Sequence, residues 1–175
     1  LQLAALSLGD LLSQRLSSLP GVTLRSSDAA ARARLAASGP AELAQHAGVE
    51  LLLSGSIERS SQSGNGRVEL TLFDLRAGAP NRRWVPWHYD LPLLAQASDL
   101  AGIQRATEVI AQRVADELRL DLDPGRAAQS TPRDLRAYRL FLLAFGREAE
   151  VSCLGTGAAQ LLRDSLALDP SYPPA

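Results

Sequence analysis

Several residue types and features are scarce or absent in this chain of 175 residues. A single cysteine, Cys153, excludes an internal disulfide and a multi-thiolate metal site. The two histidines, His46 and His88, argue against a histidine-rich metal centre. No apolar run reaches the roughly 18 residues that a membrane-spanning helix needs. The net charge of -1 leaves no basic field for nucleic acid. We therefore expect no metal site, no cofactor and no nucleic-acid partner.

Methionine and lysine are also missing. The chain begins with Leu1, and all 18 of its basic residues are arginine. A translated protein begins with methionine, so we expect a processed chain or a piece of a longer protein. Hydrophobic residues make up 46% and charged residues 21%, which is ordinary for a globular domain and argues against wholesale disorder.

The first part of the chain is punctuated by glycine and proline. Leucines recur at spacings of three and four over residues 1–19, which predicts an amphipathic helix, and Pro20–Gly21 ends it. Gly48 suits the left-handed conformation that follows many helices. The other elements predicted here are a strand at Val22–Leu24, a helix from Ser27 or Asp28 to Ala37, and a helix over Ala41–Ala47.

A β-meander is predicted next. The apolar run Val49–Ile57 favours a strand buried on both faces. Partial alternation predicts a second strand over Arg67–Asp74. A third strand, Trp84–Tyr89, contains Pro86, which cannot donate a ladder hydrogen bond, so this strand is predicted to be an edge strand or bulged. The connecting turns are Gly64–Gly66 and Ala77–Asn81.

Helices dominate the remainder. A helix capped by Ser98 or Asp99 runs to Leu118, and two more are predicted from Pro132 and over Gly157–Leu168. The fold class is therefore α+β: a small mixed sheet of three or four strands with helices on it, then a helical hairpin. The predicted boundaries are an α+β domain at 1–120, a linker at 121–131 and a truncated hairpin at 132–175.

One cluster could carry chemistry. His88 lies beside Tyr89 and Asp90, with Trp84 nearby, which allows an acid–base or stacking site. The alternative is an edge strand on which His88 faces water. Neighbouring residues of a strand point to opposite faces, which favours this alternative. We therefore assign no catalytic residue, and the ligand-binding residues stay unknown.

Three other features have structural explanations. His46 is placed to interact with the dipole at a helix end. Cys153 is expected to act as a small hydrophobe or a turn residue. The glycines at 64 and 66 join two strands rather than a strand and a helix, which argues against phosphate binding.

Several segments together resemble a known domain family. The chain resembles the domain like the amino-terminal domain of TolB that precedes tetratricopeptide (TPR) repeats in many bacterial signalling proteins. The segments that carry this resemblance are Asp10–Val22, Ala41–Ile57, Arg67–Asp74, Trp84 with Tyr89–Asp90, Ile103–Leu118 and Leu161–Ala175.

The resemblance implies a function and a location. It implies a non-enzymatic sensory or protein-interaction module whose partner is a protein or a small ligand, with dimerisation left open. The family's opening strand and a membrane anchor would lie before Leu1, next to a winged-helix, kinase or cyclase domain. The module would then be periplasmic, with a cytoplasmic location as the alternative. The other functions considered are a structural component of the cell envelope and a hydrolase that uses His88.

The resemblance to a TPR repeat also implies an interaction surface. A repeat of about 34 residues cannot bury its apolar face alone. The apolar residues of the hairpin must therefore pack on the α+β domain, on further repeats or on another chain. We also expect an exposed apolar patch near Tyr172–Ala175. The candidate interaction surface is Tyr138, Phe141, Leu142, Phe145 and Tyr172.

Overall fold

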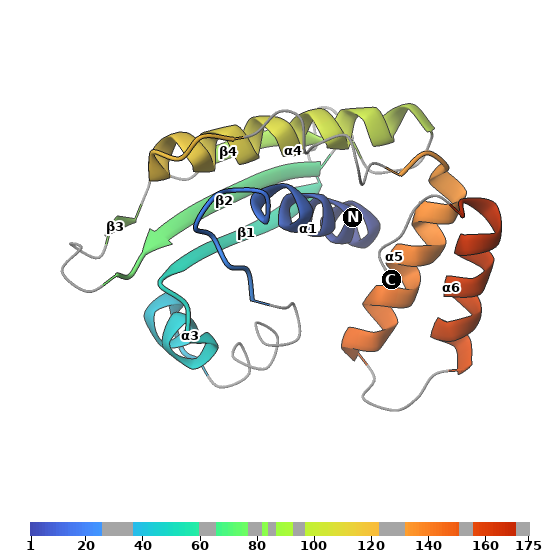
Figure 1. Cartoon of the computed structure of the whole chain (residues 1–175), viewed down its shortest axis with the longest axis horizontal. Coiled ribbons are helices and arrows are strands. Elements are labelled where there is room, and N and C mark those ends of the chain that lie inside the picture. The colour runs from blue at the N-terminus through green and yellow to red at the C-terminus, as the bar shows by residue number, and fades with distance from the viewer. Residues whose placement is uncertain are drawn as a thin grey trace. The chain divides into compact units, whose positions relative to one another are not determined.

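The computed structural model of the chain is shown in Figure 1. It describes residues 1–25, 37–59, 66–76, 82–83, 87–92, 97–122, 132–150 and 156–170, and for residues 82–83, 97–98, 145–150 and 156 it describes the backbone alone. The chain forms two compact units. We call Leu1–Val22 with Leu91–Ala175 the helical unit, and Thr23–Asp90 the sheet unit.

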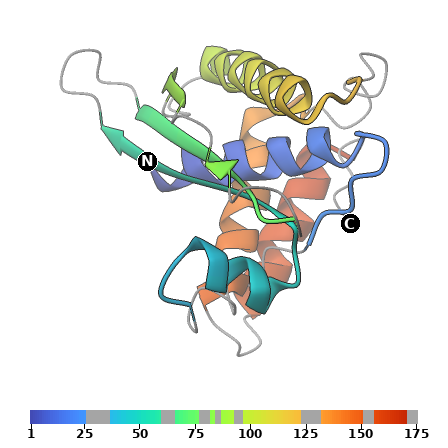
Figure 2. The same ribbon diagram turned by 90° about the vertical axis from the view of Figure 1, so that its left-hand side faces the viewer.

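The helices described in the helical unit are α1 (Gln2–Leu16), α4 (Ala97–Leu118), α5 (Leu135–Glu150) and α6 (Thr156–Leu168). Helix α1 packs against both α4 and α5, and α5 packs against α6. Figures 1 and 2 show α5 and α6 side by side as a hairpin. The predicted helical hairpin is therefore present. Because α5 also packs on α1, the hairpin belongs to the same unit as α1 and α4. The two units are therefore not divided at the predicted linker, residues 121–131.

Helix α1 is the amphipathic helix that the leucine spacing predicts, and its leucines at 8, 11, 12 and 16 are buried. It ends at Leu16, three residues before the predicted end at Leu19. Two serine hydroxyls explain the earlier end, because Ser17 donates to the carbonyl of Gln14 and Ser18 to that of Arg15, both at 2.7 Å. Side-chain hydroxyls that bind the last carbonyls of a helix compete with its continuation.

Helix α4 buries an apolar stripe that includes Ile103, Ile110 and Val114, whose spacing places them on one face of the helix. It ends with Arg119 in the left-handed conformation, at φ 56°. The backbone N–H of Leu120 donates to the carbonyl of Ala115, which is the six-residue bond of a Schellman motif. An arginine thus occupies a position where glycine is usual.

Polar contacts fix the ends of the α5–α6 hairpin. The carboxylate of Asp134 accepts the backbone N–H of Ala137 and caps α5. Helix α6 ends at Leu168, before Asp169–Pro170, as predicted. The carboxylate of Asp169 accepts the backbone N–H of Arg133, so it joins the two outer ends of the hairpin.

The sheet unit contains α3 (Pro40–Ala47) and strands β1 (Leu51–Arg59), β2 (Gly66–Asp74), β3 (Arg82–Arg83) and β4 (Trp87–Leu91), the last residue of β4 being the first of the returning helical unit. Helix α3 ends with Gly48 at φ 63°, in the left-handed conformation predicted for it. The chain is thus α+β, as predicted.

Strand β2 is the centre of the sheet. It pairs with β1 on one side, and with β3 and β4 on the other. Figures 1 and 2 show β1 and β2 as long neighbouring strands. The β1–β2 pairing is antiparallel and unbroken over nine residue pairs, from Leu51 opposite Asp74 to Arg59 opposite Gly66. The β2–β3 pairing is also antiparallel. The predicted mixed sheet would contain a parallel pair of strands, and neither of these two pairs is parallel.

Two strand predictions are wrong. Residues 22–24 form no strand. Strand β1 is not buried on both faces, because its side chains are half-buried or exposed. Its position is consistent with this exposure, since among the described residues β1 pairs with one strand, β2. The predicted helix at 27–37 and the predicted turns at 64–66 and 77–81, together with Pro86, lie wholly or mostly outside the described residues.

Candidate functional site

The candidate interaction surface is not exposed where the structure describes it. Tyr138, Phe141 and Leu142 are 0%, 3% and 1% exposed within the helical unit. They face inward because α5 packs on both α1 and α6. Of the three packing partners left open for the hairpin, the structure shows the first, because α5 contacts α1, which lies within the predicted α+β domain at 1–120. The side chain of Phe145 and the whole of Tyr172 lie outside the described residues.

Tyr138 joins α5 to α1 through a buried polar cluster. Its hydroxyl accepts a hydrogen bond from Ser7 Oγ at 3.1 Å and donates to Asp10 Oδ2 at 3.0 Å. Ser7 is fully buried, and Gln14 Nε2 donates to the other oxygen of Asp10 at 3.0 Å. The ring of Tyr138 stacks on that of Phe141, with centroids 6.3 Å apart. This cluster gives the α1–α5 contact a specific geometry.

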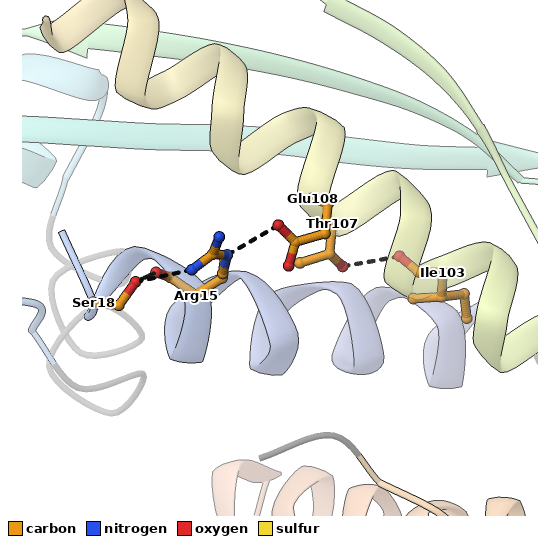
Figure 3. Close-up of polar contacts among 5 residues, drawn as sticks. All are labelled: Arg15, Ser18, Ile103, Thr107 and Glu108. Carbon is orange, nitrogen blue, oxygen red and sulfur yellow. Dashed lines mark hydrogen bonds and ion pairs between the residues drawn. The ribbon is translucent and has the colours of Figure 1, made fainter. Parts of the chain in front are cut away.

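A second group of polar contacts joins α1 to α4 and contains a buried arginine. Figure 3 shows Arg15 pointing from α1 toward Glu108 on α4. Arg15 Nε donates to Glu108 Oε2 at 3.0 Å, and the two side chains are 6% and 47% exposed. Arg15 Nη1 also donates to Ser18 Oγ at 3.3 Å. Beside this pair, the hydroxyl of Thr107 donates to the carbonyl of Ile103 at 2.9 Å. A buried cation needs such partners to offset its lost hydration.

The outer face of the sheet carries the histidine singled out in the sequence. His88 on β4 lies opposite β2, with its Nε2 atom 3.5 Å from Glu69 Oε2, and both side chains are about half exposed. His88 and Asp90 are exposed, whereas Trp87 is buried and Tyr89 is half-buried. The alternation places Tyr89 on the opposite face from His88 and Asp90. These three side chains therefore do not converge on one cavity.

The remaining singled-out residues fall in two groups. His46 lies in the last turn of α3, where a positive charge is favourable for the helix dipole. Cys153 and Trp84 lie outside the described residues. Over the described ranges, no three or more His, Cys, Asp and Glu side chains are grouped so that they could hold a metal ion. A search of the same ranges finds no helix with the length and hydropathy of a membrane span.

Two charged groups of the sheet unit have shifted pKa values. The backbone N–H of Ser38 donates to Glu42 Oε2 at 2.8 Å, and this bond lowers the pKa of the Glu42 carboxyl. The guanidinium of Arg76 donates to both oxygens of the buried Asp74, which raises the pKa of Arg76. Both shifts move titration away from neutral pH. Both groups therefore stay charged near neutral pH, and their hydrogen bonds stabilise the segments in which they lie.

One edge of β1 faces β2, and along the other edge no strand of the described residues pairs with the backbone. The backbone N–H of Leu75 donates to the carbonyl of Glu50 at 2.8 Å, one step beyond the β1–β2 register. Because hydrogen-bonded and non-hydrogen-bonded pairs alternate in an antiparallel ladder, the even-numbered residues of β1 bond to β2. The odd-numbered residues therefore direct their N–H and C=O groups to the opposite edge. These residues are Leu51, Leu53, Gly55, Ile57 and Arg59.

The residues of β1 lack the sequence features that usually block strand addition. Natural edge strands carry lysine, proline, a bulge or an inward charge, or are very short. Strand β1 has nine residues in continuous register and contains no proline and no lysine. Its charged residues, Glu58 and Arg59, are confined to its end. Among the described parts of the chain, no strand pairs with this edge.

Sequence reasoning missed the open edge of β1, the polar cluster around Tyr138 and the Arg15–Glu108 ion pair. The unbroken apolar start of β1 predicted a strand buried on both faces, although the serines and glycine that follow it were a signal of partial exposure. Arg15 lies between leucines on a helix whose pattern predicted one apolar face. Nothing in that pattern indicates that α1 is covered by two helices.

Comparisons with known proteins complete the description of the site. Searches against protein-family models, curated proteins and solved structures found no match to this chain.

Proposed function

We propose that this chain is a non-enzymatic sensory or protein-interaction module. The observation that carries the proposal is the open edge of β1, with five residues whose backbone groups point away from β2. An exposed strand edge can accept a further strand, in which main-chain hydrogen bonds supply affinity and alternate side chains supply specificity. The module would thus bind its partner through the backbone N–H and C=O groups of β1.

The setting of the module comes from its resemblance to TolB amino-terminal-like domains. On that basis we propose that it is the extracytoplasmic part of a bacterial signalling protein or membrane-anchored transcriptional regulator. A partner that binds one arrangement of such a protein better than another shifts the population toward that arrangement. The size of the signal is limited by the difference between the two affinities.

Hydrogen exchange of the backbone amides tests the open edge directly. In a dilute, monomeric sample, we expect the amides of Leu53, Gly55 and Ile57 to exchange much faster than those of Ser54 and Ser56. The reason is that only the even-numbered amides donate to β2. Amide-resolved exchange measured by NMR gives the comparison. Equal protection of odd and even amides in the dilute monomer would show that the rest of the chain occupies this edge, and the proposal would lose its main support.

A hydrolase that uses His88 is the competing function, and the His88–Glu69 proximity is the observation that favours it. We expect the chain to show background turnover of generic ester, phosphate and peptide substrates. The His88→Ala variant should give the same background, because His88 and Tyr89 face opposite sides of the sheet. A His46→Ala variant is the matched control, because it removes the other histidine of the chain from an exposed position on α3. Turnover above background that disappears in His88→Ala but persists in His46→Ala would replace the proposed function by the enzymatic one.

A further inference from the structure

We infer that the partner of the β1 edge is the β1 edge of a second copy of this chain. The two strands would pair antiparallel about a two-fold axis through Gly55 and join two sheets into one. This inference rests on the proposed function, because it names the occupant of the same edge.

The positions of the outward-facing backbone groups determine how two β1 strands can pair. Only odd-numbered residues direct backbone groups to the open edge, so an incoming β1 must place its own odd residues opposite them. With Gly55 opposite Gly55 of the second copy, residue 53 lies opposite 57 and residue 51 opposite 59. This register satisfies the alternation at every position. It is also the one two-fold register that pairs all nine residues of both strands.

Side-chain complementarity is the second argument. In this register Leu53 lies opposite Ile57 of the second copy, on the face that also carries Val68, Leu70 and Leu72 of β2. An aliphatic pair across strands stabilises a sheet on such a face. At the axis, Gly55 offers no side chain that could obstruct close approach. The apolar face of each sheet would therefore continue into the other.

On the outer face the small residues at the centre fit the same register, whereas Leu52 lies opposite Glu58 of the second copy. Here Ser54 lies opposite Ser56 of the second copy, and this pair occurs twice around the axis. Small hydroxyl side chains opposite each other can form hydrogen bonds across strands. Glu58 lies opposite Arg67 within its own sheet, which offsets its charge. The net charge of -1 adds little long-range repulsion between two copies.

The expected affinity is modest. One pair of nine-residue strands is smaller than the standard stable interface of about 1,600 Å². We therefore expect a reversible monomer–dimer equilibrium with a micromolar dissociation constant, dependent on concentration.

Two double variants of the full 175-residue chain test the pairing, and they differ only in the sign of the charge at position 54. Ser54→Lys with Ser56→Lys places like charges opposite each other across the axis. Ser54→Glu with Ser56→Lys places opposite charges there. Both variants contain Ser56→Lys, and position 56 lies opposite Glu69 within its own sheet. The opposite charges there stabilise the sheet to the same extent in both variants. Analytical ultracentrifugation gives the dissociation constants, and circular dichroism checks the folds.

The wild-type chain should dimerise, the like-charged variant should bind itself at least about tenfold more weakly, and the oppositely charged variant should bind as tightly as wild type or tighter. A wild-type chain that stays monomeric at hundreds of micromolar would overturn the inference. So would an equal loss of affinity in both variants.

Disulfide trapping tests the same register without charged residues. In a Cys153→Ser background, chains with Ser54→Cys are mixed with chains with Ser56→Cys. These positions form a non-hydrogen-bonded pair, in which side chains are close enough for a disulfide. We expect cross-linked dimers in the mixture and not in either single sample. Cross-linking of Ser54→Cys alone to the same extent would contradict the register.

The outcomes separate this inference from the proposed function. If the odd-numbered β1 amides exchange rapidly in dilute and concentrated samples alike, the second copy is the wrong partner and the edge remains open for another. If they gain protection only in the concentrated sample, the inference is supported. Protection that is already complete in the dilute monomer contradicts both.

Discussion

Replacing Gly55 by alanine is expected to destabilise the chain by about 1–3 kcal/mol. A Cβ atom at this position would overlap the side chain of Leu70 and lie 2.7 Å from the backbone carbonyl oxygen of Glu69. Leu70 is buried and lies directly opposite Gly55, so its side chain has little room to move. The Glu69 oxygen belongs to the neighbouring strand, so relief would need a shift of the β1 or β2 backbone.

Gly9 provides a matched control, because the same substitution there should have the opposite effect. Gly9 lies in α1, and a Cβ atom at this position would meet nothing within 4 Å. Alanine in a helix interior is favoured over glycine by up to about 1 kcal/mol. Urea unfolding of Gly55→Ala and Gly9→Ala measures both effects. A Gly55→Ala variant as stable as wild type would show that β1 and β2 pack more loosely than the structure indicates.

Local signals predicted the elements of this fold most successfully. Gly48 and Pro170 act through their own backbone conformations, so the ends of α3 and α6 could be predicted from a few residues. The stripe of α4 likewise follows from spacing along one helix. These predictions needed no knowledge of what the elements pack against.

Predictions that depended on distant partners were less successful. An apolar run is the same in an edge strand and a central strand, and only the number of neighbouring strands separates them. For this reason β1 was predicted to be buried on both faces. Tyr138 was assigned to an interaction surface with three alternative packing partners, because its actual partners, Ser7 and Asp10, lie more than 120 residues earlier in the chain. No periodicity within α5 could identify them.

The open edge of β1 follows from the same dependence on partners. Side-chain pattern shows which faces of a strand are apolar, but it does not show which backbone groups are paired. The single bond from Leu75 to Glu50, combined with the β1–β2 register, determines which amides face outward. The proposed interaction site is thus a property of the backbone, which residue types alone do not reveal.

Removing the hydroxyl of Tyr138 is expected to cost about 1–3 kcal/mol of unfolding free energy. In Tyr138→Phe the ring remains, but the fully buried Ser7 loses its acceptor and Asp10 loses a donor. Buried polar groups left without a partner keep their desolvation cost. Tyr89→Phe is the matched control, because the half-buried Tyr89 has no hydrogen bond from its hydroxyl to the described residues. Its effect should stay within about 0.5 kcal/mol.

A double-mutant cycle with Ser7→Ala assigns the cost to the hydrogen bond. If Ser7 and Tyr138 interact directly, the double variant should lose less stability than the sum of the single variants, by roughly 0.5 kcal/mol or more. Urea unfolding of the four proteins supplies the cycle. Additive losses would mean that the hydroxyl of Ser7 does not contribute to the stabilising contacts of Tyr138. Because the cluster joins α5 to α1, loss of the hydroxyl should also raise amide exchange in α5 more than in α4.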